Sequence, residues 1–172
     1  NLDTPGTEHN VGALLVDNVK VEIGGQEIDK HTGAWMETWA ELTEPNPTGA
    51  GTTAGGDTLF QKMSQMGGCT DLNSSGTKAW VPLQFWFNRN PGLALPLIAL
   101  QYHEVKVTIQ LGKSTECTFD DVQLWADYIY LDTDERRRFA QVSHEYLIEQ
   151  VQEENAKGSS HTSTLNFNHP VK

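Results

Sequence analysis

Residues 103–111, which read HEVKVTIQL, decide the fold class because apolar and polar side chains alternate along them. In an extended chain, alternate residues point to opposite faces. The stretch therefore predicts a β-strand with a polar face in water and a buried face that carries Val105, Val107, Ile109 and Leu111.

Other stretches carry related strand patterns. Residues 18–23, NVKVEI, alternate in the same way, and Gly24-Gly25 ends them with turn chemistry. Residues 122–131, VQLWADYIYL, are apolar on most of both faces, which predicts a strand buried on both sides. Further strands are expected over residues 81–87, 145–152 and 163–167.

Helices are expected to be short. Thr32 is placed to cap a helix with Trp35, Trp39 and Leu42 on one face, packed on an end of the sheet. Asp132 is placed to cap one or two turns that run through residue 139. Many short strands and generous turns favour an all-β sandwich or barrel over a βαβ fold.

Composition limits the function classes. A chain of 172 residues is long enough for one main domain with its own core. The net charge of -11 disfavours binding to nucleic acid or anionic lipid. The longest apolar run, residues 93–100, is far below the roughly 20 residues of a membrane span.

Cys69 and Cys117 lie far apart in the sequence, which favours a reducing compartment. The opening at Asn1 looks like the middle of a longer protein.

The search for catalytic, cofactor and metal motifs returns none that we would assign. Residues 49–54 match GxGxxA, but prolines precede them where a nucleotide fold needs a strand. Asp132 and Asp134 have DxD spacing, which we interpret as an acidic first helical turn. Cys69 has no activating histidine in its sequence context. We therefore expect no catalytic residue, no cofactor and no metal.

The remaining polar candidates have plain interpretations. His103-Glu104 and His144-Glu145 do not continue to a zinc motif, and the isolated histidines are interpreted as ordinary surface or turn residues. The triplet 136–138, RRR, is expected to form a salt-bridge cluster, either between subunits or within the domain, where the carboxylates just upstream offer local partners. Asn73 opens a glycosylation sequon in the surface excursion between about residues 43 and 78. The isolated histidines are His31, His161 and His169.

Three long stretches together carry a family resemblance: residues 21–31 leading into the Trp35/Trp39 helix, residues 81–105, and residues 124–150. The chain resembles the major capsid protein of the nucleocytoplasmic large DNA viruses, which include iridoviruses and phycodnaviruses. The resemblance implies a double jelly roll, three copies of which form a pseudo-hexagonal capsomer in an icosahedral shell.

The resemblance also implies a division of the chain. Residues 1–152 would form the first jelly roll without its N-terminal strands, with short helices in loops. Residues 153–162 would be a linker, and residues 163–172 the first strand of the second jelly roll. The implied partners are other copies, neighbouring capsomers and minor capsid proteins, without direct nucleic-acid contact or membrane insertion. The implied location is the virion capsid, assembled in the infected host cell, in its cytoplasm.

Two other classes stay open at this point. A jelly-roll carbohydrate-binding module would use Trp35, Trp80 or Trp86 as a stacking platform. A cupin-like enzyme would need several histidines and a carboxylate on one metal, and the histidines here are scattered. Under the capsid hypothesis, the isolated chain should expose unpaired strand edges and apolar faces and should aggregate.

Overall fold

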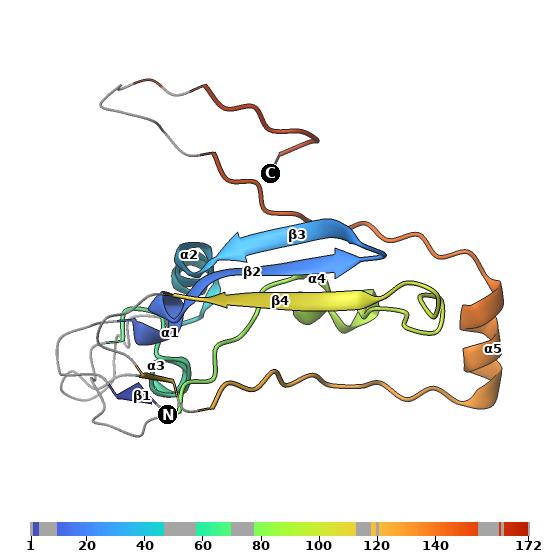
Figure 1. Cartoon of the computed structure of the whole chain (residues 1–172), viewed down its shortest axis with the longest axis horizontal. Coiled ribbons are helices and arrows are strands. Elements are labelled where there is room, and N and C mark those ends of the chain that lie inside the picture. Colours follow the sequence, from blue (N-terminus) through green and yellow to red (C-terminus); the bar gives the residue numbers. More distant parts are fainter. Residues whose placement is uncertain are drawn as a thin grey trace.

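A three-stranded antiparallel sheet in the order β3-β2-β4 forms the centre of the protein (Figure 1). The computed structural model describes residues 10–46, 58–69, 78–112, 121–154, 162 and 164–171, and the backbone of 2–3 and 118–119. The strands of the sheet are β2 (Val16–Ile23), β3 (Gln26–Thr32) and β4 (Val105–Leu111). The strands predicted over residues 18–23 and 103–111 are confirmed.

The two faces of the sheet differ as the alternation predicts. Val19 and Val21 on the central strand have no exposed surface. On the opposite face, Lys20 donates a hydrogen bond to Glu22 at 2.7 Å and lies 3.8 Å from Glu27. The hydrogen bond raises the pKa of Lys20 and lowers the pKa of Glu22. Burial of the valines fixes which face is inside.

Short helices and a second pair of strands surround this sheet. Strands β1 (Leu2–Asp3) and β5 (Thr118–Phe119) pair antiparallel with each other. The all-β expectation is therefore met only in part, since the described residues combine antiparallel sheets with helices, none of them long and apolar enough to cross a membrane. The helices are α1 (Val11–Leu14), α2 (Gly33–Thr43), α3 (Leu59–Ser64), α4 (Trp86–Arg89), the 3-10 helix η2 (Pro91–Leu93) and α5 (Thr133–Gln141).

Helix α2 begins as predicted but buries a different face. The Thr32 hydroxyl accepts a hydrogen bond from the Trp35 backbone N–H at 3.3 Å, so the cap is confirmed. A Cβ on Gly33 would lie 2.0 Å from the Ala13 carbonyl oxygen, so the helix meets α1 in backbone contact. This approach turns Gly33, Met36 and Ala40 inward, leaves the tryptophans half-buried and leaves Leu42 76% exposed.

Four of the predicted strands are wrong in this structure. Residues 81–87 run as irregular chain into α4, and residues 122–131, 145–152 and the described part of 163–167 form no strand. A strand is stabilised by a neighbour that satisfies its backbone groups. No other described segment pairs with these stretches in a ladder.

The core lies between the inner face of the sheet, α2 and the segment that precedes α4. Phe85 is fully buried and stacks on Phe87 with ring centroids 5.4 Å apart. Met36 of α2 is also fully buried. Each such side chain contributes roughly 1.5 to 3 kcal/mol of burial free energy. The other buried apolar members are Val11, Ala13, Leu15, Val16, Val19, Val21, Ala40, Met66 and Trp86.

Replacing Met36 by alanine should lower the free energy of unfolding by about 2 to 5 kcal/mol, because the deletion leaves a cavity in this core. Met63→Ala on α3 is the matched control, since Met63 is 47% exposed and should lose much less. Urea denaturation followed by tryptophan fluorescence measures both. Equal losses for the two variants would contradict the placement of the core.

Candidate assembly surface

An extended segment rich in apolar side chains is highly exposed in the described part of the chain. We call residues 122–130 the outer segment. It leads into α5 at one end of the molecule (Figure 1). Tyr130 is 93% exposed and Trp125 is 70% exposed, so the expected burial on both faces is wrong here. Its other exposed large side chains are Val122, Leu124, Tyr128 and Ile129.

The outer segment has the properties of a strand without a partner. Its backbone makes no hydrogen bond to the backbone of another described residue. Trp125 contacts the edge of Trp80, with ring centroids 5.5 Å apart. Contiguous exposed apolar surface marks sites of protein contact, and unpaired strand edges recruit further strands. The segment is therefore suited to burial by more polypeptide.

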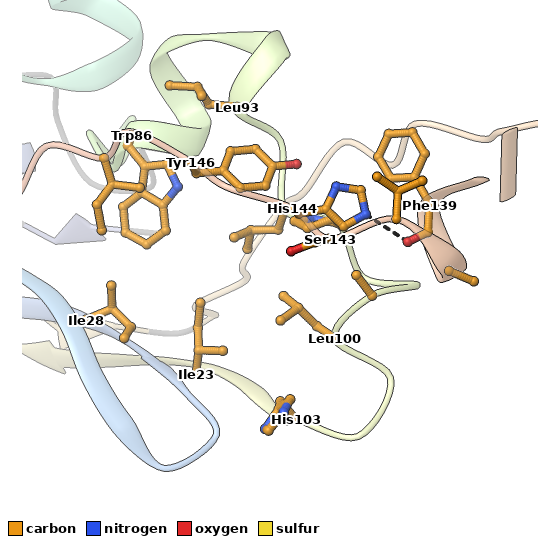
Figure 2. Close-up of a pocket in the computed structure, with 16 residues that line it drawn as sticks. Ile23, Ile28, Trp86, Leu93, Leu100, His103, Phe139, Ser143, His144 and Tyr146 are labelled. Atoms are coloured by element: carbon orange, nitrogen blue, oxygen red, sulfur yellow. Dashed lines mark hydrogen bonds between the residues drawn. The ribbon is translucent and has the colours of Figure 1, made fainter. Parts of the chain in front are cut away.

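An apolar cleft of about 520 Å³ opens near the turn of the β2–β3 hairpin. Figure 2 shows Ile23 and Ile28 of the hairpin facing Trp86 and Tyr146. His103 and His144 also line the cleft, and a ring nitrogen of His144 lies 2.8 Å from the Phe139 carbonyl oxygen. The described lining contains no carboxylate, so the cleft lacks the ligand set of a cupin-like metal site.

A buried polar cluster joins β3, α4 and the chain near residue 150. Asp29 and His31 are 4% and 2% exposed, with 3.8 Å between His31 Nδ1 and Asp29 Oδ2. Arg89 of α4 pairs with Glu149 at 2.9 Å. Burial raises the pKa of Asp29, and burial together with the nearby Arg89 charge lowers the pKa of His31 to about 4.

The interpretation of His31 as an ordinary surface or turn residue is wrong. His31 pairs across the sheet with Val19, and Asp29 pairs with Val21, so both lie opposite fully buried valines. The imidazole packs on the Phe85 ring at 4.0 Å. The sequence carried no signal for this, because residues 28–31 read IDKH and their one apolar member, Ile28, lies on the other face of the strand. The inward position of both groups follows from the pairing of β3 with β2.

Helix α5 carries the predicted local charge pairs. Asp132 caps the helix by accepting from the Glu135 backbone N–H at 2.9 Å, which confirms its interpretation as a cap. Arg137 lies 3.7 Å from Asp134 and Arg138 lies 4.0 Å from Glu135, so the expected salt bridges are confirmed. These pairs are solvent-exposed and contribute little to stability. The helix ends at Gln141, two residues beyond the predicted end.

The tryptophans proposed for a sugar platform serve other contacts. Trp86 is 5% exposed and lies in the core. The ring of Trp35 packs on Trp39 at 5.8 Å, and Trp80 packs on Trp125.

Cys69 is buried, with its Sγ 3.7 Å from Gln65 Oε1, and His169 is exposed.

Several sequence candidates lie outside the described residues. They are the sequon residue Asn73, the GxGxxA stretch 49–54, Cys117, His161, and residues 155–161 of the expected linker. Among the residues that are described, no group of three or more His, Cys, Asp or Glu side chains could hold a metal ion.

Comparison with known proteins gives one consistent result. Residues 3–132 match the family model described as "Major capsid protein N-terminus". The chain is 49% identical to the major capsid protein of Pyramimonas orientalis virus over 100% of its own length and 44% of that protein. It is 42% identical to capsid protein 1 of Acanthamoeba polyphaga mimivirus, over 95% of this chain and 31% of that one.

A solved structure agrees with these sequence matches. The chain resembles a chain in the quasi-atomic model of the PBCV-1 virus capsid with a TM-score of 0.66 and 37% identity, covering 98% of this chain and 45% of that chain. The present chain therefore spans less than half the length of each of these relatives.

The isolated 172-residue chain should self-associate through the outer segment. The double variant Trp125→Arg, Ile129→Arg should shift the population toward monomer, because burying two guanidinium groups costs more than burying apolar side chains. Sedimentation velocity measures the shift. Leu42→Arg on α2 is the control, since it adds charge at an exposed residue away from the segment. Equal solubilisation by Leu42→Arg would assign the effect to net charge alone.

Proposed function

Because this chain belongs to the major capsid protein family of large DNA viruses, we propose that it forms part of a structural subunit of an icosahedral viral shell. In this proposal three copies form a pseudo-hexagonal capsomer, which contacts neighbouring capsomers and minor capsid proteins. The subunit is a component of the virion capsid, assembled in the cytoplasm of the infected host cell. Its role is mechanical, and the family is a structural one rather than an enzyme family.

The observation that carries this proposal is the 49% identity to a viral major capsid protein across the whole chain. The outer segment adds physical support, because its exposed apolar side chains need further polypeptide to cover them, which a longer capsid protein supplies. The relatives named above are capsid proteins, and nothing in the comparisons favours a carbohydrate-binding module.

We further propose a jelly-roll architecture for the complete protein. Residues 1–152 would belong to a first jelly roll, residues 153–162 to a linker, and residues 163–172 to the first strand of a second. The support is the antiparallel sheet together with the extended segments at 122–131 and 145–152, which pair in no ladder with another described segment. These segments would become strands when neighbouring strands are present.

Native mass spectrometry on the protein from its natural source tests the shell proposal. We expect a subunit more than twice the 19.1 kDa of this chain that runs as a trimer or in larger assemblies. Its apolar surfaces make an isolated monomer unfavourable. A stable monomer of 19.1 kDa would overturn the proposal.

Hydrogen exchange tests the jelly-roll architecture separately. In the isolated chain carrying Trp125→Arg and Ile129→Arg, which we expect to favour the monomer, amides of residues 122–131 should exchange almost freely, since they have no backbone partner among the described residues. In the full gene product the same amides should be protected by at least a hundredfold. Residues 18–23 in the centre of the sheet serve as the internal control and should be protected in both. Free exchange at 122–131 in the full gene product would exclude a strand there.

A further inference from the structure

The chain after residue 148 is held to β3 by a small set of polar contacts. The Val151 backbone N–H donates to Asp29 Oδ1 at 3.0 Å, and the Gln150 side-chain amide donates to the Ile28 carbonyl oxygen. Glu149 pairs with Arg89 of α4 at 2.9 Å. Apolar packing contributes little beside these contacts, because the residues around position 150 are mostly exposed.

The cluster that accepts the Val151 bond is buried and incompletely satisfied. Asp29 Oδ1 also accepts from the Lys30 backbone N–H at 2.9 Å, whereas Asp29 Oδ2 has no hydrogen-bond partner. Both ring nitrogens of His31 are buried without a partner. Unpaired buried polar atoms are costly and are uncommon in folded proteins. Because of these atoms, the arrangement in which residues 149–151 lie on β3 is sensitive to the protonation states of Asp29 and His31.

We propose that Asp29 and His31 form an acid-sensitive latch, which holds residues 149–151 on β3 at neutral pH and releases them as the pair takes up a proton. In the closed form, an imidazolium at His31 has only Asp29 Oδ2 within reach and lies close to the Arg89 guanidinium. In the open form, water solvates the ring. The charged groups that face the pair are Arg89 from α4, Glu149 from the chain near residue 150, and Glu27 from β3 itself.

The direction in which pH shifts the opening equilibrium follows from the pKa changes of His31 and Asp29. The pKa of His31 is lowered to about 4 in the closed form and returns to about 6.5 on solvation, so the open form binds more protons between these values. Acid therefore favours opening, by roughly 30-fold at pH 5 if His31 acted alone. Asp29 opposes this effect, because burial raises its pKa and the closed carboxyl holds its proton more tightly. The net increase in opening is therefore expected to be smaller than the factor for His31 alone.

Hydrogen exchange at residues 147–154 of the full gene product, corrected for intrinsic rates, measures the latch between pH 7.5 and pH 4.5. Protection should fall, by less than roughly 30-fold at pH 5, beginning below pH 6.5. In His31→Phe, which keeps a ring against Phe85 but does not titrate, protection should not fall in acid, because the remaining group, Asp29, favours the closed form when it takes up a proton. His103→Phe is the matched control, since it removes an exposed histidine outside the cluster and should respond as the unmodified protein does.

Two results would overturn the latch. One is protection at residues 147–154 that does not change with pH in the unmodified protein, and the other is an equal fall in His31→Phe. If His31→Phe fails to fold, an NMR titration of the His31 ring in the unmodified protein decides instead. The latch requires an apparent pKa well below 6.5 that coincides with the loss of protection. An ordinary pKa for His31 would exclude it.

Discussion

The pairing of β2 on both of its edges is the constraint on which the rest of the structure depends. Strand β2 pairs with β3 from Asn18 to Ile23 and with β4 from Val16 to Ile23, so its central residues are hydrogen-bonded on both sides. This arrangement removes the backbone of Val19 and Val21 from water, and their side chains follow into the core. The helices then pack on a face whose position is already fixed.

The sheet also determines the position of the buried ionisable side chains. Because β3 is in register with the buried valines of β2, Asp29 and His31 must point inward and must accept a low-dielectric environment. In the middle of α2, the Glu37 carboxylate accepts from the backbone N–H groups of Gly67 and Gly68, at 3.0 Å each for Oε1. Asp29 thus ties a distant segment to β3, and Glu37 ties a distant loop to α2, in each case through backbone N–H groups.

Local sequence patterns predicted the elements that are marked by their own residues, such as an alternating strand or a capped helix. The alternation of residues 103–111 and the caps at Thr32 and Asp132 predicted β4, α2 and α5. The apolar pattern of residues 122–131 did not yield a strand, because a strand also requires a neighbour that the pattern cannot supply. The inward position of His31 could not be predicted locally, because it depends on the pairing of His31 with Val19 across the sheet. The family resemblance came from long motifs and is confirmed by the match over residues 3–132.

The charged face of the sheet affects how many copies of the chain fold with the correct strand alignment. Lys20 lies between Glu22 and Glu27 on the polar side, directly behind Val19 and Val21 on the apolar side. Sliding β2 by one residue would bring Lys20 into the core and the valines into water, so the mispaired sheet is strongly disfavoured. In the proposed shell, which contains many identical copies, misfolded copies would disturb assembly. A sheet with a single low-energy alignment therefore acts as a quality control that operates before any two copies meet.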